Sequence, residues 1–361
     1  LSITLFSDLE LDYLMASHWI ECVPNFSEGR DRSVIDMITK PIIEIHGVDL
    51  LDVDMGYDFN RTVVTMVGEA EAVLQAAIEC TIIAVNLIDM RKHSGEHARM
   101  GAVDVVPFIP LSGSSIAECV KLSERYAEAV SEELGLPVYL YAEAARHGDR
   151  IRLPDIRKGE YEGMEEKMSS SNWKPDYGPN IFSPSMGVTA TGARQVLIAY
   201  NVNLNTDDKK IANSIASKIR TSGSLIRDDN GMKVIGEDGQ PLRKPGKFNS
   251  LQAAGWMFDE DTAQVSMNLL DHSITGLYDV TEAIRNEAKE LGYSVISSEL
   301  VGLVPLDAML SAGSKYLEDS NDVSELALVN AAVVGLSLDE SNNFNSQSSI
   351  IEWAIADKIG D

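Results

Sequence analysis

The sequence predicts an α+β protein of two ferredoxin-like sandwich lobes with a ligand cleft between them. Three observations support this fold class. Strand and helix patterns follow one another in the order β-α-β-β-α-β within residues 18–109, and the same order recurs within residues 195–300. A polar tract with several prolines and glycines, residues 144–192, joins the two runs, and its irregular composition predicts an ordered functional loop. The chain of 361 residues is also longer than one hydrophobic core usually serves.

In the first lobe, residues 18–26 alternate in polarity as a strand does, and the apolar residues of Asp31–His46 recur at helical spacing. Gly47 ends that predicted helix. Two further strands form the simplest hairpin, and a long helix then leads to a fourth strand. A last helix and strand extend the lobe. These remaining elements are predicted at residues 48–55, 60–68, 70–89, 102–109, 114–134 and 137–141.

The second lobe repeats this order without matching sequence identity. Between its first helix and second strand, residues 227–247 contain Asn-Gly and Asp-Gly pairs, which favour an exposed hairpin insert. Its strands and helices are predicted at residues 195–204, 207–220, 251–258, 263–270, 280–291, 293–300, 306–317 and 323–334. We therefore expect an N-terminal extension, two subdomains and a tail, at residues 1–14, 15–196, 197–341 and 342–361.

The composition argues against several classes of partner. Lysine and arginine number 30 against 56 aspartates and glutamates, so the net charge of −26 repels nucleic acid and anionic membrane surfaces. The most apolar stretch, residues 70–90, is interrupted by polar side chains and does not predict a membrane span. Three widely spaced cysteines without a C-x-x-C pair suit reduced thiols, so we expect a cytoplasmic protein.

The densest group of chemically active side chains lies in the glycine-containing segment Met90–Gly101. It holds two of the six histidines of the chain together with three basic residues and one carboxylate. A histidine titrates near neutral pH, so His97, oriented by Glu96 or by a more distant aspartate, is a candidate proton shuttle. The alternative interpretation is a solvated loop without catalytic function.

The same segment spells H-x-x-E-H from His93 to His97. In that pattern two histidines one helical turn apart bind zinc, and the glutamate between them, here Glu96, acts as a base. Gly95 inside the supposed helix and basic side chains on both sides argue against a helix and against a dication there. A zinc hydrolase is therefore an alternative function, and our main expectation is that no metal binds.

Two other segments contain candidate site residues, an aspartate at the end of a predicted strand and a glycine-containing loop. Asp54 follows an apolar strand, where its carboxylate either points into a cleft or caps the turn before Gly56. Residues 178–187, with the sequence GPNIFSPSMG, offer backbone amides that a flat ligand could approach. The sequence contains no G-x-G-x-x-G, P-loop or G-x-S-x-G motif, which argues against common nucleotide and acyl-enzyme sites.

Blocks running in order from about Trp19 to the 330s resemble the formiminotransferase family, whose members occur alone or as the front part of formiminotransferase-cyclodeaminases. The blocks are ECVPNFSEGR, LLDVDMG, NRTVVTMVG, LIDMRKHSGEHARMGAVDVVPFIPL, PVYLYAEAA, NLLD, TGL and LVGLVPL. The resemblance implies a folate-dependent formimidoyltransferase of two ferredoxin-like lobes. It also implies a homodimer, no metal, and tetrahydrofolate lodged between the lobes as a co-substrate.

The resemblance further implies a reaction and the residues that perform it. The formimino group of N-formimino-L-glutamate moves to N5 of tetrahydrofolate in histidine degradation, by attack on the amidine carbon and departure of glutamate. His97 corresponds to the catalytic histidine of the family and Asp54 to the acid of its LLDVD block, with Glu96, Arg99 and Arg61 in support. The folate-binding loop of the family falls on Gly178, Pro179, Asn180, Ile181, Phe182, Ser183, Pro184, Ser185, Met186 and Gly187.

Some features are particular to this chain. Met186 stands where we expect an aromatic residue before the glycine. Only about twenty residues follow the second lobe, so we expect any cyclodeaminase activity on a separate chain. A non-catalytic folate-binding protein remains a further alternative, because it would keep the loop without needing His97. Basic side chains that are candidates to bind the glutamate carboxylates of both substrates are Arg61, Arg91, Lys92, Arg99 and Arg194.

Overall fold

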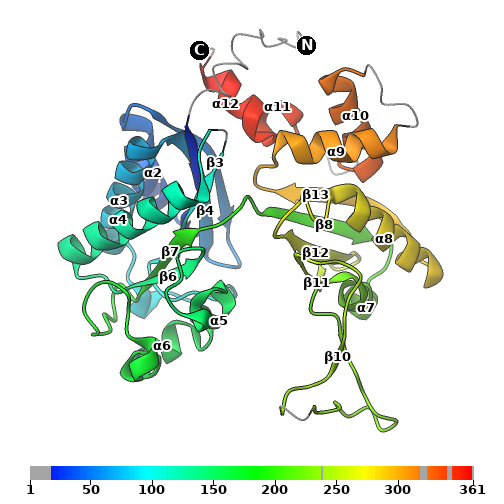
Figure 1. Ribbon diagram of the computed structural model, residues 1–361, viewed down its shortest axis with the longest axis horizontal. Helices are drawn as coiled ribbons and strands as arrows, with labels where there is room; N and C mark the ends of the chain where they lie inside the picture. Colours follow the sequence, from blue (N-terminus) through cyan, green and yellow to red (C-terminus); the bar gives the residue numbers. More distant parts are fainter. Residues whose placement is uncertain (1–17, 112, 237–238, 318–322, 340–343, 360–361) are drawn as a thin grey trace. The chain divides into compact units, whose positions relative to one another are not determined.

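The chain folds into two compact units, which the computed structural model describes in detail. The first unit runs to Gln195 and takes in the chain from Ile355, and the second spans Val196–Ala354 (Figure 1). Both units combine helices with antiparallel strands, which confirms the predicted α+β class. The predicted extension 1–14 lies outside the described residues. The described residues are 18–111, 113–236, 239–317, 323–339 and 344–359.

The first unit contains a seven-stranded sheet. Its strands are β1 (Trp19–Cys22), β2 (Asn25–Phe26), β3 (Val48–Gly56), β4 (Arg61–Glu69), β5 (Val103–Pro110), β6 (Val138–Ala142) and β7 (Thr189–Ala193). β1 and β2 follow one another between β4 and β5 and pair antiparallel with both. β3 pairs with β4 as the predicted hairpin, and β7 and β6 continue the sheet in parallel beyond β5.

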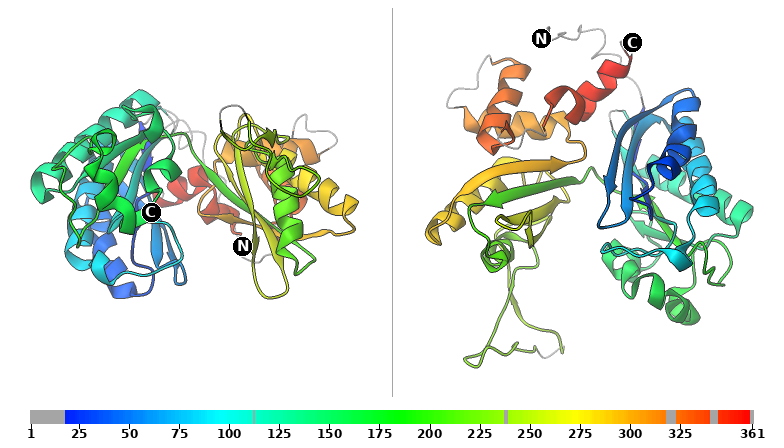
Figure 2. Two further views of the ribbon diagram at one scale, coloured as in Figure 1. Left: turned by 90° about the horizontal axis from the view of Figure 1, so that it is seen from below. Right: turned by 180° about the vertical axis from the view of Figure 1, so that it is seen from behind.

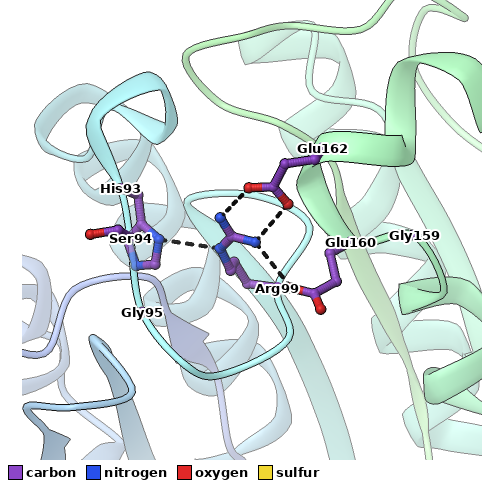
Figure 3. A pocket seen from close by; sticks show the side chains of 7 residues that line it. All are labelled: His93, Ser94, Gly95, Arg99, Gly159, Glu160 and Glu162. Atoms are coloured by element: carbon purple, nitrogen blue, oxygen red, sulfur yellow. Dashed lines mark hydrogen bonds and ion pairs between the residues drawn. The ribbon is translucent and has the colours of Figure 1, made fainter.

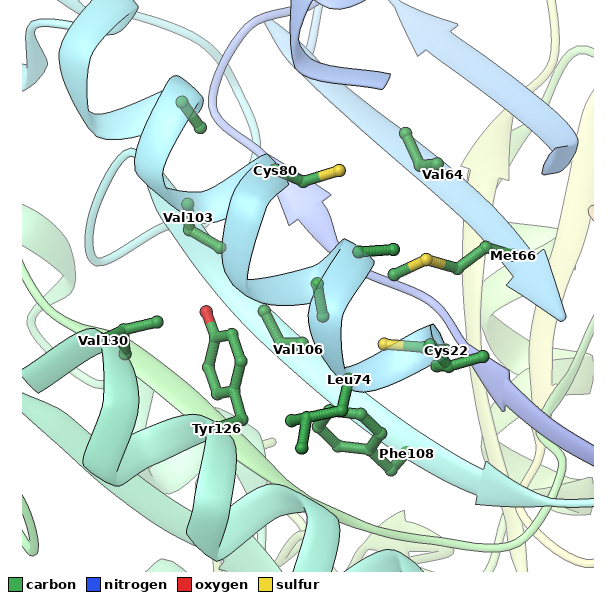
Figure 4. Packing of buried hydrophobic residues seen from close by; sticks show 14 of the residues in the cluster. Cys22, Val64, Met66, Leu74, Cys80, Val103, Val106, Phe108, Tyr126 and Val130 are labelled. Atoms are coloured by element: carbon green, nitrogen blue, oxygen red, sulfur yellow. The ribbon is translucent and has the colours of Figure 1, made fainter. Parts of the chain in front are cut away.

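Three helices cover one face of this sheet (Figures 1 and 2): α2 (Arg32–Glu44), α3 (Ala70–Leu87) and α4 (Ile116–Leu134). The side chains of Cys80, Phe108 and Tyr126 are fully buried in the core beneath them (Figure 4). Among the described helices, α3 is long and apolar enough to cross a membrane by length and composition alone. It packs against both α2 and α4, with 44% of its residues buried, as expected of a core helix.

The tract that joins the two predicted lobes, residues 144–192, is more regular than its composition indicates. It contributes the parallel strand β7, and its Met164 and Met168 pack with Tyr139 and Tyr141 in a second small core. Because successive strand residues point to opposite faces, this core lies on the sheet face opposite the three long helices. The interpretation of the whole tract as a loop was therefore wrong. Its helices are α5 (Leu153–Arg157) and α6 (Glu160–Ser169).

A buried arginine holds this tract against the sheet. Arg150 is 2% exposed, and its Nη1 donates to Oδ2 of Asp176 at 2.7 Å. Its Nη2 donates to two backbone carbonyls at 2.8 Å each. The guanidinium carbon also lies 5.1 and 5.6 Å from the ring centroids of Tyr139 and Trp173. The charge is thus compensated by a carboxylate, carbonyl oxygens and aromatic faces, as a buried cation requires.

The second unit has a four-stranded antiparallel sheet in the order β11-β12-β8-β13. Its strands are β8 (Ile198–Leu204), β11 (Leu251–Met257), β12 (Ala263–Leu269) and β13 (Val295–Val301). With helices inserted after the first and third of these strands, the unit repeats the β-α-β-β-α-β order of the first. Its helices are α7 (Lys209–Ile219), α8 (Leu277–Glu290), α9 (Leu306–Tyr316), α10 (Glu325–Leu336) and α11 (Ser346–Ser349). The last helix, α12 (Ile351–Ile359), begins in the second unit and belongs to the first from Ile355.

The insert predicted at residues 227–247 forms an exposed arm on the second unit (Figure 1). At its base, β9 (Ser224–Leu225) pairs antiparallel with β10 (Arg243–Lys244). Antiparallel bridges continue along the arm between Arg227 and Lys233 and between Ile235 and Pro241. The expected hairpin character is therefore present in its described residues.

We expect Arg150→Ala to lower the free energy of unfolding by about 3–5 kcal/mol, because the buried carboxylate of Asp176 would lose its partner. Chemical denaturation of the full chain measures this. The matched control is Arg152→Ala, since that side chain is 67% exposed and lies 3.9 Å from Asp155. The control should change stability by less than about 1 kcal/mol. Similar small losses in both variants would show that the Arg150 cluster does not stabilise the tract.

Candidate active site

The segment Met90–Gly101 connects α3 to β5 without a regular α-helix. Only its first three residues form a short 3-10 turn, and the H-x-x-E-H positions follow in irregular backbone. Gly95 lies against the turn before β4, where a Cβ atom would be 2.2 Å from the carbonyl oxygen of Phe59. Glycine is therefore required for this close approach. Asn60 fixes the same contact, since its Nδ2 donates to the carbonyl of Ser94 at 3.0 Å.

Arg61, at the start of β4, is the side chain that contacts His97. Its Nη1 lies 2.6 Å from Nε2 of the imidazole. A guanidinium only donates hydrogen bonds, so Nε2 accepts and the neutral ring carries its proton on Nδ1. That Nδ1 atom is buried and has no hydrogen-bond partner among the described residues. The ring of Phe59 meets the imidazole edge-on at 6.4 Å between centroids.

The surroundings of His97 favour its neutral form. Burial, followed by the positive charges of Arg61 and Arg157, lowers the pKa of His97 from 6.5 to about 3. Because an imidazole is positively charged when protonated, both loss of solvent and nearby cations oppose protonation. His97 is consequently an uncharged base at neutral pH, one whose pKa an incoming negative charge would raise.

Asp54 and Glu96 do not contact His97 in this structure. On the β3–β4 hairpin, Asp54 is opposite Val63 and Arg61 is opposite Gly56, so the Asp54 and Arg61 side chains share one face of the sheet. Asp54 is exposed, and its charge contributes to raising the pKa of Arg61, against the larger lowering by burial. Glu96 is also exposed. No hydrogen bond joins either carboxylate to the imidazole within the described part of the chain.

The sequence did not single out a buried ion pair beside this group. Asp104 on β5 is 1% exposed and accepts from Nε of Arg157, on α5, at 3.0 Å. Its other oxygen accepts from the backbone amide of Met100 at 2.9 Å, which fixes the end of the His97 segment. Lys167 caps α5 by donating from Nζ to the carbonyls of Asp155 and Ile156, at 2.8 and 2.6 Å, and to that of the C-cap residue Lys158 at 3.2 Å. The sequence does contain one indication of this ion pair, because an aspartate within the apolar run AVDVVPF is rarely buried without a partner.

His93 and Arg99 stabilise the segment from its other side (Figure 3). Nε2 of His93 lies 2.8 Å from the carbonyl oxygen of Asn60, and its Nδ1 accepts from Nε of Arg99 at 3.3 Å. Arg99 also forms ion pairs with Glu160 and Glu162 on α6, at 3.1 and 2.6 Å. A pocket of about 430 Å³ opens there, lined by His93, Ser94, Gly95, Arg99, Gly159, Glu160 and Glu162.

These contacts differ from the helical zinc site that H-x-x-E-H describes. The segment is not helical, so His93 and His97 do not lie on successive turns of one helix face. Both ring nitrogens of His93 already have partners, and Nε2 of His97 faces the guanidinium of Arg61. The described residues also hold no cluster of three or more histidine, cysteine or acidic side chains arranged for a metal.

The loop of residues 178–187 borders the His97 segment. Two of its carbonyls accept from the amides of Met90 and Ala102, at 2.9 and 2.8 Å, and so hold both ends of that segment. Gly187 has φ +72°, and a Cβ atom there would lie 2.2 Å from the carbonyl oxygen of Met100. Its glycine is therefore needed for the local backbone. The predicted folate contacts of this loop stay a prediction.

The basic side chains near His97 differ in their partners. Arg99 and Arg157 are paired with carboxylates, and Arg91 pairs with Asp89 at 2.7 Å. Arg61 forms no ion pair with any described residue, although it is partly buried. Arg61 is thus the predicted carboxylate-binding candidate that lies beside His97 and has no carboxylate of the described residues paired with it.

Comparisons with known proteins bear on the whole chain. Residues 19–194 match the family model "Formiminotransferase domain, N-terminal subdomain", and residues 199–356 match "Formiminotransferase domain". Glutamate formimidoyltransferase of Streptococcus pyogenes serotype M1 is 41% identical over 83% of this chain and 93% of its own length. The Thermoplasma acidophilum protein of the same name is 40% identical, over 87% of this chain and 98% of its own.

Longer relatives match as well. Formimidoyltransferase-cyclodeaminase of Rattus norvegicus is 45% identical over 94% of this chain. The chain spans 60% of that relative's length, and a similar share of its counterpart in Dictyostelium discoideum, which is 44% identical. The similarity therefore covers the part of these proteins that corresponds to the two family models.

We expect Arg61→Met to raise the pKa of His97 above about 3 but to leave it below 6.5, because burial is the larger cause and remains. Nuclear magnetic resonance of histidine-labelled protein, with His97→Gln to assign the signal, measures this pKa. The lowered pKa of His97 also predicts how stability changes with pH. Between pH 6.5 and 3 the unfolded chain binds a proton on this histidine that the folded chain does not bind. His97 should therefore make the free energy of unfolding fall as the pH falls from 6.5 towards 3. A wild-type His97 that titrates near 6.5 would contradict both expectations.

Proposed function

The chain belongs to the formiminotransferase family, and on that premise we propose that it transfers the formimino group from N-formimino-L-glutamate to N5 of tetrahydrofolate. The observation that carries the proposal is the neutral, partly buried His97 beside an uncompensated Arg61. Transfer between two amines needs a group that can accept and return a proton, together with a cation for the substrate carboxylates. This pair supplies both.

His97 is the general base and acid of the proposed reaction. Attack of the N5 amine on the amidine carbon releases a proton, and departure of glutamate as an amine requires one. A positioned imidazole that performs both transfers contributes roughly 10²- to 10⁴-fold in rate. In the free protein the base nitrogen Nε2 is occupied by Arg61, so it must be released before it can act.

Arg61 links substrate binding to this release. A carboxylate of N-formimino-L-glutamate that pairs with the guanidinium draws its donor away from Nε2. The same negative charge offsets the cations that lower the His97 pKa, so the imidazole becomes a stronger base when the substrate is present. Binding of N-formimino-L-glutamate thereby activates the base that takes the proton from the N5 amine of tetrahydrofolate. Asp54, on the same sheet face as Arg61, supports the protonated imidazole in this scheme.

The wider setting is proposed from family membership. It includes a role in histidine degradation, a cytoplasmic location and a homodimer. The placement of tetrahydrofolate between the two lobes, with the loop 178–187 as one wall, also stays a prediction. The non-catalytic folate-binding alternative differs from the proposal in one measurable respect, since it predicts folate binding without transfer.

A spectrophotometric assay of the purified protein with tetrahydrofolate and N-formimino-L-glutamate tests the proposal. His97→Ala should lower kcat by about 10²-fold or more while the Kd for tetrahydrofolate stays within twofold, because the lost group acts on protons. His147→Ala is the matched control, since that histidine is exposed in the same unit. His93→Ala should cost less than His97→Ala, because His93 only anchors the segment. Near-native turnover of His97→Ala would refute this assignment.

The reaction should also proceed without a metal ion. We expect activity to survive dialysis against a chelator, since the His97 ring faces a guanidinium. Elemental analysis of the same sample checks for bound zinc. Stoichiometric zinc, together with loss of activity on chelation, would instead favour a hydrolase that uses His93, Glu96 and His97.

A further inference from the structure

Asn60 is a buried polar residue at the end of the turn between β3 and β4, one position before Arg61. Only 7% of it is exposed. Its backbone amide donates to the carbonyl of Tyr57 at 3.2 Å, which closes the turn, and its φ of +48° lies in the left-handed region. Asparagine adopts this conformation more readily than most other residues. The turn therefore accounts for an asparagine here, but it does not account for the partners of its side chain.

The side chain of Asn60 joins two segments that are distant in sequence. Its Oδ1 accepts from the backbone amide of Gly29 at 3.0 Å, and its Nδ2 donates to the carbonyl of Ser94 at 3.0 Å. These partners lie 31 and 34 positions away. A carboxamide has both a donor and an acceptor, and here each is used on a different backbone segment. The side chain of Asn60 thus connects the segment before α2 to the segment that carries His97.

The main chain of Asn60 makes a further bond to the His97 segment. A carbonyl oxygen only accepts hydrogen bonds, so Nε2 of His93 donates to the carbonyl of Asn60, at 2.8 Å. Asn60 therefore holds two consecutive residues, His93 and Ser94, which precede His97 by four and three positions (Figure 3).

Two glycines allow the three segments to approach one another closely. A Cβ atom on Gly29 would lie 2.5 Å from the amide nitrogen of Arg61. A Cβ atom on Gly95 would lie 2.8 Å from the Cβ atom of Asn60. Both distances are far shorter than the 3.5–4.0 Å or so at which non-bonded atoms pack, so a larger residue would force the segments apart. The segments are therefore packed backbone against backbone around Asn60.

This packing fixes the start of β4 relative to the His97 segment. Arg61 follows Asn60 directly, and its Nη1 lies 2.6 Å from Nε2 of His97. An arginine side chain has several rotatable bonds and loses much conformational entropy when it is held in one place. A contact of this length between the two side chains therefore depends on how firmly their backbones are held. Asn60 supplies this support, because it precedes Arg61 and binds the His97 segment at two residues.

We propose that Asn60 is a positioning residue of the transfer reaction, which holds Arg61 and His97 at hydrogen-bond distance until a substrate carboxylate takes the place of the imidazole. The inference rests on the proposed function, because that function gives the pair its role. Asn60 acts only through the two backbones that it joins. The alternative is that Asn60 stabilises the hairpin and has no influence on His97.

Asn60→Gly tests the assignment, because glycine keeps the left-handed backbone and removes both side-chain hydrogen bonds. The kcat for formimino transfer, corrected for the folded fraction, should fall at least about tenfold. The pKa of His97 should rise above its wild-type value of about 3, because the ring gains solvent and the guanidinium is no longer fixed beside it. Nuclear magnetic resonance of the folded, histidine-labelled variant measures this pKa, which a loss of stability alone would not change.

Ser337→Gly is the matched control. Ser337 also has a left-handed backbone, with a φ of +62°, and its Oγ accepts from Nη2 of Arg285 at 2.9 Å in the second unit. The control thus removes a comparable hydrogen bond from a residue of another sheet. It should leave both kcat and the pKa of His97 unchanged.

Gly95→Ala reaches the same contact from the opposite side. Its methyl group would push the His97 segment away from Asn60, while the side chain of Asn60 stays in place. This variant should lower kcat and raise the pKa of His97 as Asn60→Gly does, and it decides the question if Asn60→Gly does not fold. Gly148→Ala is its control, because no other group lies within 4 Å of a Cβ atom there.

The outcomes separate this assignment from the proposed function. An unchanged kcat, or an unchanged pKa of His97, in folded Asn60→Gly would overturn the role of Asn60. A wild-type protein that does not transfer the formimino group would instead contradict the proposed function. In that case the pKa comparison still shows whether Asn60 holds Arg61 beside His97, and an unchanged pKa would overturn that as well.

Discussion

The hydrogen bond from Arg61 to His97 is the interaction on which the rest of the candidate site depends. It selects the tautomer of the imidazole, because a guanidinium can only donate and Nε2 must accept. It also brings a positive charge next to the ring, which adds to burial in keeping His97 neutral. His97 is therefore neutral and able to act as a base, but its basic nitrogen Nε2 is held in a hydrogen bond with Arg61. Its availability then depends on what else can attract Arg61.

Beyond the 3-10 turn at its start, the segment that carries His97 has no helix or strand of its own to hold it, so its position comes from parts of the chain distant in sequence. Asn60 holds one side through the carbonyl of Ser94, and the loop 178–187 holds both ends through backbone hydrogen bonds. On the α5–α6 side, the ion pairs of Arg99 and Arg157 complete the support. Irregular backbone needs such external partners because its polar groups are not satisfied within the segment.

Local patterns in the sequence predicted the α+β class, the β3–β4 hairpin and the segment around His97, because periodicity and a dense polar motif are visible over short ranges. Strand β7 was missed since Thr-Ala-Thr-Gly-Ala lacks large β-formers, and its burial comes from its neighbours β5 and β6. The partners of Arg99 and Arg157 lie 61 and 53 positions away, so only the folded chain identifies them. For the same reason, sequence reasoning expected a carboxylate beside His97, where the fold instead brings Arg61.

The charge distribution is consistent with the acidic substrate that we propose for this strongly acidic chain. At a net charge of −26, the field of the whole protein repels anions, and most arginines near the site are neutralised by carboxylates. Arg61 differs because its near partner is an uncharged imidazole, so its positive charge remains available at short range. A substrate carboxylate that replaces this partner gains a charged hydrogen bond in a partly buried place, where solvent screens it little. Selectivity for an anion then arises from one uncompensated guanidinium, and the bond it gives up frees the base that the proposed reaction uses.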